Sequence, residues 1–350
     1  MKNQTLATSQ TSTPIRIALL AMLAATLTLG TSAFAQPSQY SSFDAPKAGR
    51  EPNQGTFPTA INQQGWIGGT LVDNANLAKA FLRPPNGAYI MVVPPGSFQS
   101  FVAAINSSAE VVGFFYSTTA TYGFLRDASG NYTLLAISGA YTTTAAGVND
   151  AGMVVGYASL TTGNIGFLWD KQDGYTQFEV PGSKPGTTYA LAINNSGVVT
   201  GYYYDDNDYT HGFIRSSSGE FSTFELSQGT ETESTAINAS GQVTGWGNEE
   251  EGETFGFVAN THGVIGTFGI AGSPGNAGVA INDSGVIVGY EFSDGGGNAS
   301  FERDQSGNVT VLQIPFPNTA NQPSGINSRG DITGYYTDSA GVNHGWVGIP

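Results

Sequence analysis

The chain has 350 residues, enough for one large domain or two ordinary ones. It contains no cysteine, which excludes disulfides and thiolate metal sites. A net charge of −15 argues against nucleic acid as a partner, because phosphate binding requires a basic surface. The 48 glycines are about twice the usual share and, together with 11% aromatic residues, indicate a folded protein with many turns.

The first 35 residues predict a secretory signal peptide. Lys2 and Arg16 are followed by an apolar stretch, residues 17–29, that is too short to span a bilayer comfortably. Ala33-Phe34-Ala35 then fits a cleavage site before Gln36, although an uncleaved membrane anchor is the alternative. No later segment is long and apolar enough to insert into a membrane. We therefore expect a bacterial protein that is secreted or periplasmic.

A short string, a small residue followed by Ile or Val and then Asn, recurs through the rest of the chain. The seven asparagines are Asn62, Asn106, Asn149, Asn194, Asn238, Asn282 and Asn327. They are spaced 44, 43, 45, 44, 44 and 45 residues apart, so the repeats occupy nearly all of the mature chain. We expect a short linker at residues 36–40 and a single repeat domain at residues 41–350.

Each repeat has further fixed positions. The third residue after the Asn is Gly in six repeats and Ala109 in the second, which is the pattern of a type I turn. The seventh residue after the Asn is always Gly, which indicates the close approach of another group. An aromatic residue follows this Gly in six repeats, and another lies 18 or 19 residues after each Asn. Each repeat therefore predicts four short antiparallel strands, which we call A to D.

Four strands in about 44 residues predict an all-β fold, a seven-bladed β-propeller of four-stranded antiparallel blades. The last repeat ends after strand C, at Gly345-Trp346-Val347. Near the mature N-terminus, Phe43-Asp44-Ala45-Pro46 resembles the strand D segment Phe178-Glu179-Val180-Pro181. We therefore expect the N-terminal strand to join the last blade and close the ring.

These residues resemble the bacterial extracellular HAF-repeat family, named for a His-Ala-Phe string. The corresponding strings are Lys79-Ala80-Phe81, Tyr122-Gly123-Phe124, Ile165-Gly166-Phe167, His211-Gly212-Phe213, Phe255-Gly256-Phe257, Ala299-Ser300-Phe301 and His344-Gly345-Trp346. The His of the family name is kept only at His211 and His344. The resemblance implies a secreted, propeller-like protein and brings no established reaction, cofactor or catalytic residue.

The B–C loops and the strand ends beside them are the candidate binding surface, because they vary between repeats and combine acidic with aromatic residues. Aromatic rings beside carboxylates suit an extracellular glycan or a basic segment of a protein. The alternative is that the aromatic residues fill the space between blades. The predicted ligand-binding residues are Tyr116, Tyr203, Tyr204, Trp246, Tyr336, Glu249, Glu250 and Glu251.

One B–C loop also suggests a metal site. Asp205, Asp206 and Asp208 offer several oxygen atoms for Ca²⁺ within a short segment. The spacing does not match an EF-hand, and a solvated acidic loop that keeps the protein soluble is the alternative.

The function that these features favour is that of a non-catalytic binding or interaction module, acting as a monomer. The alternative is an extracellular hydrolase or lyase that acts on a polysaccharide or peptide polymer at the channel mouth. Glycosidases need two carboxylates at a set separation, and nothing in the sequence selects such a pair. The sequence therefore assigns no catalytic residue and no cofactor besides calcium.

Overall fold

A computed structural model describes residues 36–227, 230–248, 252–292 and 298–350. The secondary structure of these residues consists of 28 β-strands, and they contain no helix. None of them belongs to a helix long and apolar enough to cross a membrane. The predicted signal peptide and Glu249, Glu250 and Glu251 lie outside the described residues.

The strands follow the repeats in groups of four. The strands A are β2 (Gly55–Ile61), β6 (Gln99–Ile105), β10 (Thr142–Val148), β14 (Tyr189–Ile193), β18 (Thr232–Ile237), β22 (Gly275–Ile281) and β26 (Ala320–Ile326). The strands B are β3 (Ile67–Val72), β7 (Val111–Tyr116), β11 (Val154–Leu160), β15 (Val199–Tyr204), β19 (Val243–Asn248), β23 (Ile287–Phe292) and β27 (Ile332–Thr337). The strands C are β4 (Ala78–Arg83), β8 (Thr121–Arg126), β12 (Gly163–Asp170), β16 (Thr210–Arg215), β20 (Thr254–Asn260), β24 (Asn298–Arg303) and β28 (Asn343–Ile349). The strands D are β5 (Ile90–Val92), β9 (Tyr132–Leu135), β13 (Gly174–Phe178), β17 (Phe221–Phe224), β21 (Gly263–Phe268), β25 (Val309–Val311) and, from the N-terminal segment, β1 (Gln39–Phe43).

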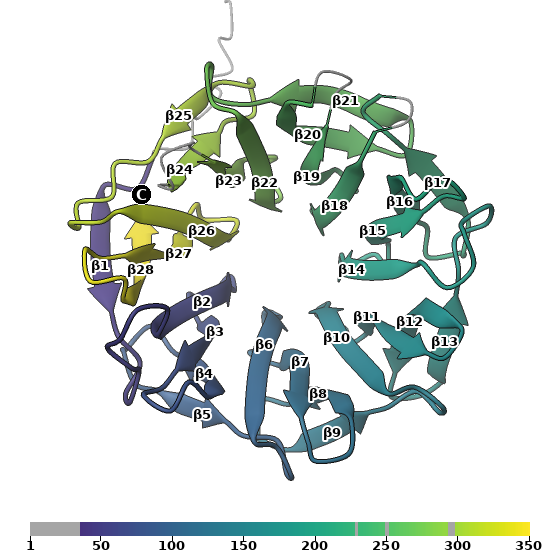
Figure 1. Cartoon of the computed structure of the whole chain (residues 1–350), viewed down its shortest axis with the longest axis horizontal. Helices are drawn as coiled ribbons and strands as arrows, with labels where there is room; N and C mark the ends of the chain where they lie inside the picture. Colours follow the sequence, from purple (N-terminus) through teal and green to yellow (C-terminus); the bar gives the residue numbers. More distant parts are fainter. Residues whose placement is uncertain (1–35, 228–229, 249–251, 293–297) are drawn as a thin grey trace, which may run out of the picture. The chain divides into compact units, whose positions relative to one another are not determined.

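Hydrogen bonds join these strands into three sheets of eight strands and one sheet of four. Within each group the strands are antiparallel neighbours, whereas the two groups of an eight-stranded sheet are joined by a single parallel pair, such as Thr142 with Thr121. The described residues form one compact unit, in which the strands A lie nearest the centre and the strands D at the rim (Figure 1). All of the strands A therefore border one axis.

The two ends of the repeat region share one group. β1 pairs antiparallel with β28, and this pairing sets Phe43 opposite Gly345. The same relation holds in a complete repeat, where Phe178 of strand D lies opposite Gly166 of strand C. In both places a Cβ on the glycine would lie 2.5–2.6 Å from the phenylalanine ring. The N-terminal strand thus has the position and the packing of a strand D.

The core is built from the aromatic residue of strand C in every repeat. These side chains are among the largest fully buried ones of the described chain: Phe81, Phe124, Phe167, Phe213, Phe257, Phe301 and Trp346. Burying an aromatic side chain removes about 150–250 Å² of surface from water. This aromatic residue of the repeat motif is therefore a major source of hydrophobic stabilisation in each repeat.

The turn between strands A and B has the predicted geometry. The glycine of the turn has a positive φ in six repeats, between 75° and 88°, as at Gly197 and Gly330. In the second repeat Ala109 takes the same left-handed conformation, with φ 59°. A residue with a Cβ is destabilised there, which explains why the other repeats have glycine.

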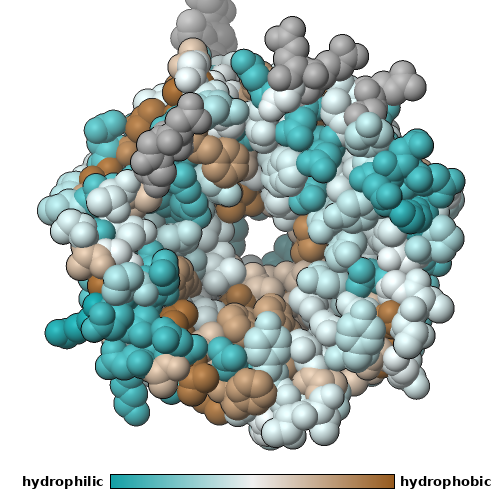
Figure 2. Space-filling view, viewed as in Figure 1, coloured by the Kyte–Doolittle hydropathy of each residue, from teal (hydrophilic) through white to brown (hydrophobic). Residues whose placement is uncertain are grey.

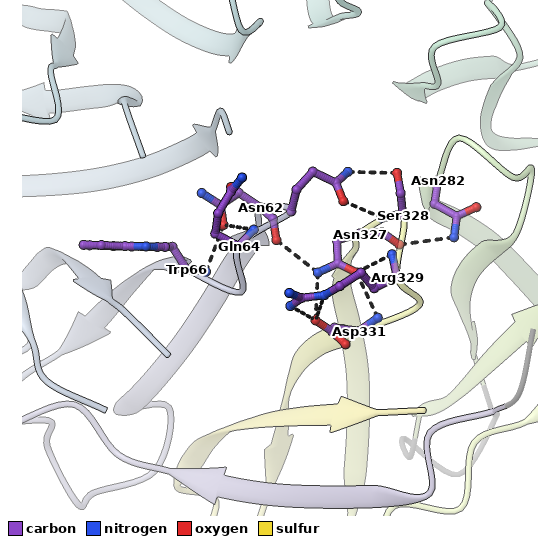
Figure 3. Close-up of polar contacts among 9 residues, drawn as sticks. Asn62, Gln64, Trp66, Asn282, Asn327, Ser328, Arg329 and Asp331 are labelled. Atoms are coloured by element: carbon purple, nitrogen blue, oxygen red, sulfur yellow. Dashed lines mark hydrogen bonds and ion pairs between the residues drawn. The ribbon is translucent and has the colours of Figure 1, made fainter. Parts of the chain in front are cut away.

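The repeat asparagines do more than form these turns. In each one, Oδ1 accepts hydrogen bonds from two backbone amides of its own turn, as Asn194 does from Ser196 and Val198. Nδ2 donates to the backbone oxygen of the Asn in the next repeat, at 2.9–3.2 Å. The seventh link runs from Asn327 to Asn62 and closes the cycle (Figure 3). We call this cycle the Asn ring.

Strand A contains a β-bulge in every repeat, and the bulge explains the invariant glycine of strand B. In the fourth repeat the register shifts between Ala190 and Ala192. A Cβ on Gly201 would lie 1.9 Å from the backbone oxygen of Tyr189. The prediction of a close approach at this glycine is therefore confirmed, and the approaching group is the bulged backbone of strand A.

Candidate functional site

The bulge brings together the residue five positions before each repeat Asn and the residue eight positions after it. In the fourth repeat these are Tyr189 and Tyr202, which are register partners at the start of strand A and near the end of strand B. They lie at the end of the strands that carries the D–A and B–C connections. We call the set the aromatic belt: Phe57, Thr70, Phe101, Phe114, Thr144, Tyr157, Tyr189, Tyr202, Glu233, Trp246, Ala277, Tyr290, Gln322 and Tyr335.

Rings of the aromatic belt contact one another within and between repeats. Tyr189 stacks on Tyr202 with ring centroids 4.7 Å apart, and Tyr157 of the preceding repeat meets Tyr189 edge-on at 5.1 Å. Phe57 of the first repeat meets Tyr335 of the last repeat at 5.3 Å. The belt therefore continues across the contact between the two ends of the repeat region.

The belt borders the opening at the centre of the strands. Its aromatic residues are half-buried, so each remains partly accessible to solvent. Figure 2 shows the central opening, with hydrophobic residues bordering it over β2 and β6. Exposed aromatic surface around an opening is a common feature of ligand-binding sites.

A cavity of about 340 Å³ adjoins the belt at Phe57, Gln322 and Tyr335. Tyr335 donates its hydroxyl to Oε1 of Gln322 at 2.5 Å, so the ring is held in place. Carboxamide side chains also line the cavity, from Asn53, Asn298, Asn321 and Asn343. Rings combined with carboxamides can contact the apolar face of a sugar and bind its hydroxyl groups.

The belt carries one carboxylate, Glu233 of β18. Glu233 pairs in register with Trp246, and it lies near enough to Tyr202 to raise the pKa of that phenol further, beyond the effect of burial. Burial, with a smaller effect from Glu231, raises the pKa of Glu233 to about 7. This carboxyl group is therefore partly protonated at neutral pH.

The predicted ligand-binding residues divide into two sets. Trp246 lies in the belt. Tyr116 and Tyr204 each lie two residues beyond the belt position of their own strand B, on the same face as the belt. Tyr203 and Tyr336 are one residue out of phase and buried, and each stacks on a histidine, at 5.3 and 5.0 Å. These two tyrosines pack inside the fold, away from the belt.

Several belt residues are missing from the predicted site: Phe57, Phe101, Tyr157, Tyr189, Glu233, Gln322 and Tyr335. Their common feature is the distance in sequence from the repeat Asn, five before or eight after it. In a regular hairpin, the eighth residue after the Asn would pair with the fourth residue before it. The bulge shifts the pairing by one residue, and its one sign in the sequence is the invariant glycine seven residues after the Asn.

The acidic loop proposed for calcium has other contacts. Oδ1 of Asp205 accepts backbone hydrogen bonds from Asn207 and Tyr209, and Oδ2 lies 3.4 Å from Nε2 of His211. Burial tends to raise the pKa of Asp205, but these hydrogen bonds outweigh it and hold the pKa below its usual value. Asp208 forms an ion pair with Lys184, and Asp206 is exposed.

Among the residues with described positions, no group of three or more His, Asp or Glu side chains is arranged to hold a metal ion. The calcium site at Asp205, Asp206 and Asp208 stays a prediction.

The opposite end of the opening has a different lining. A cavity of about 370 Å³ lies there among residues of the Asn ring and the residues that follow them. Many of these groups already bond to one another, as when Ser107 donates from its amide and its hydroxyl to the Asp150 carboxylate. At this end, the polar groups therefore make most of their hydrogen bonds to neighbouring repeats.

No protein-family model matches the chain, and no curated protein matches its sequence. Among solved structures, a streptogramin B lyase is similar, with 14% identity and a TM-score of 0.55, covering 89% of this chain and 98% of that one. A catalytically inactive virginiamycin B lyase from Staphylococcus aureus, with quinupristin, has 14% identity and a TM-score of 0.57, covering 89% and 99%. A prolyl endopeptidase has 14% identity and a TM-score of 0.59, covering 84% of this chain and 49% of that one.

At 14% identity these similarities show the fold alone, which is all-β and propeller-like. They do not transfer a reaction or a ligand to this chain.

Proposed function

We propose that residues 41–350 form a seven-bladed β-propeller of the HAF-repeat type that is closed by β1. In this proposal, the aromatic belt of the propeller binds an extracellular saccharide without catalysis. The protein would act outside the cytoplasm of a bacterium as a monomer, after removal of residues 1–35. The belt supports this proposal, because aromatic rings and carboxamides gather at the end of the strands where the repeats differ most.

The cavity at Phe57 and Tyr335 supports a saccharide as the ligand. Its volume of about 340 Å³ lies at the lower end of the range for small-molecule sites. The paired rings leave an apolar surface, while Gln322 and the neighbouring carboxamides offer donors and acceptors. Sugars combine an apolar face with a rim of hydroxyl groups, which this lining complements.

A glycan array tests the proposal. We expect the mature protein to bind at least one class of bacterial or plant glycan, and Phe57→Ala to weaken that binding at least tenfold. Leu134→Ala is the matched control, because Leu134 is an exposed apolar residue on the outer strand β9, remote from the belt. Thermal melts of all three proteins would verify folding. Binding of no glycan above background would contradict the proposal.

One observation favours the alternative of a hydrolase or lyase. A general acid or base works best with a pKa near the working pH, and the pKa of Glu233 is raised to about 7. Mass spectrometry of the bound glycan after incubation tests this alternative. Cleaved products from the wild type, absent with Glu233→Gln, would replace the non-catalytic proposal by an enzymatic one.

A further inference from the structure

A charge interrupts the aromatic belt at Glu233, the position that Phe57, Phe101 and Tyr189 occupy in other repeats. Register partners on antiparallel strands have their side chains on the same face, about 4.5–5.5 Å apart at Cβ. Glu233 therefore lies beside Trp246, its partner on β19. A carboxylate and an indole ring thus occur side by side at the border of the central opening.

The Glu233 carboxylate lacks a compensating partner within the described chain. No described residue donates a hydrogen bond to it, and Glu231 nearby has the same charge. The other titratable groups beside Glu233 are the phenols of Tyr189, Tyr202 and Tyr204, from β14 and β15, and the charge of Glu233 contributes to raising their pKa values. A cation that approaches a half-buried carboxylate in such surroundings stabilises its charged form.

Trp246 differs from the tyrosines beside it. Tyr189 and Tyr202 stack face to face, so the inner faces of their rings are used within the protein. No aromatic ring of the described residues stacks on the half-buried Trp246. An indole face is a good platform for a sugar ring, and it attracts cations more strongly than the other aromatic side chains do.

Resting on the saccharide-binding function proposed above, we infer that Glu233 and Trp246 form a subsite for a sugar unit that carries a protonated amine, as in a polymer of glucosamine. The sugar ring would lie on Trp246, and its ammonium group would pair with the Glu233 carboxylate through a charge-assisted hydrogen bond. The phenol hydroxyls of the neighbouring belt residues would lie beside the sugar hydroxyls. The net charge of −15 favours the approach of such a polycation.

Calorimetric titration with two sugars of equal length tests this subsite. We expect the wild type to bind glucosamine hexamer about tenfold more tightly than N-acetylglucosamine hexamer. Glu233→Gln should remove this preference, and Trp246→Ala should weaken the binding of both sugars. Glu302→Gln is the matched control, because Glu302 is a buried carboxylate of β24 outside the belt. It should leave both affinities unchanged.

A pH series separates a direct role of Glu233 from a structural one. A trimethylated glucosamine hexamer has no N–H to donate, but its positive charge still attracts the carboxylate and does not change with pH, so only the protein titrates. The carboxylate, with a pKa of about 7, is about one-tenth ionised at pH 6 and about nine-tenths ionised at pH 8. The affinity should therefore rise about tenfold over this range in the wild type and remain constant in Glu233→Gln.

The outcomes distinguish the two proposals. Equal binding of the two hexamers by the wild type overturns the amine subsite and leaves saccharide binding in place. Binding of neither hexamer, with hits on other glycans of the array, likewise overturns the amine subsite alone. Binding of hexalysine but of no glycan overturns both proposals and assigns the surface to a basic peptide.

Discussion

The two ends of each A–B strand pair differ in how much they vary between repeats. At the turn end, the same asparagine occurs seven times, and its side-chain amide and oxygen are used within the fold. At the other end, the position of Tyr189 is filled by Phe57, Glu233 or Gln322 in other repeats. An end whose hydrogen bonds are satisfied internally stabilises the ring, while the varied end can present different groups to a ligand.

The largest effect on stability is expected at the Asn ring. Asn194→Ala removes a buried hydrogen bond to Asn238 and two bonds within the turn, at about 0.5–1.5 kcal/mol each. We expect the free energy of unfolding to fall by about 2–4 kcal/mol in urea denaturation.

Tyr202→Phe provides the comparison at the other end of the same strand pair. It removes only the hydroxyl of a half-buried belt residue, and the free energy of unfolding should change by less than about 0.5 kcal/mol. Equal losses in Asn194→Ala and Tyr202→Phe would show that the two ends contribute alike, contrary to the comparison.

A smaller effect on the free energy of unfolding is expected from substitution of Glu302, the second carboxyl group with a raised pKa. Glu302 is 6% exposed, and burial, with a smaller effect from Asp304, raises its pKa to about 6. The folded state therefore holds the proton more tightly than the unfolded state, and the stability from this group is lost as pH rises from about 4.5 through 6.

Glu302→Gln should accordingly raise the free energy of unfolding by about 2 kcal/mol at pH 8 and by much less at pH 4. Thermal melts of wild type and variant across this pH range measure the difference. A variant that is less stable than the wild type at pH 8 would show that the ionised carboxylate is stabilised by its surroundings. Unchanged glycan binding by Glu302→Gln would show that this buried carboxyl group, unlike Glu233, has no role in binding.

Much of the strand pattern follows from the sequence because the Asn, the turn glycine and the strand C aromatic residue recur at fixed spacing. Each has a local physical cause: a hydrogen-bonded turn, a positive φ at Gly197, and burial at Phe213. The pairing of β1 with β28 was also expected, because the Phe43 segment resembles a strand D.

The site was less accessible from the sequence. Tyr203 and Tyr204 are adjacent tyrosines in the same motif, yet only Tyr204 faces the belt, since alternate residues of a strand point to opposite sides. Glu233 and Tyr189 were missed because the bulge in strand A sets their register with strand B. The invariant glycine of strand B accompanies the bulge, but a glycine in a strand does not by itself show how the partner strand changes register.

A small stabilising effect is expected at Ala109, in the one A–B turn that lacks the glycine. Ala109→Gly relieves a left-handed conformation that destabilises alanine by about 1–2 kcal/mol. Glycine also has more freedom in the unfolded chain, which offsets about 0.4–1 kcal/mol of the gain. We expect a net stabilisation of about 0.5 kcal/mol in urea denaturation. A loss of stability would mean that the methyl group of Ala109 contributes packing that exceeds the strain.

A crystal structure of the mature protein soaked with glucosamine hexamer tests most directly the claim that the two ends of the opening have separate roles. We predict saccharide density over Trp246 and Tyr202, with an amine nitrogen within hydrogen-bonding distance of Glu233, and none at the Asn ring. Saccharide density beside Asp150 and Asn62, with the aromatic belt empty, would contradict the account.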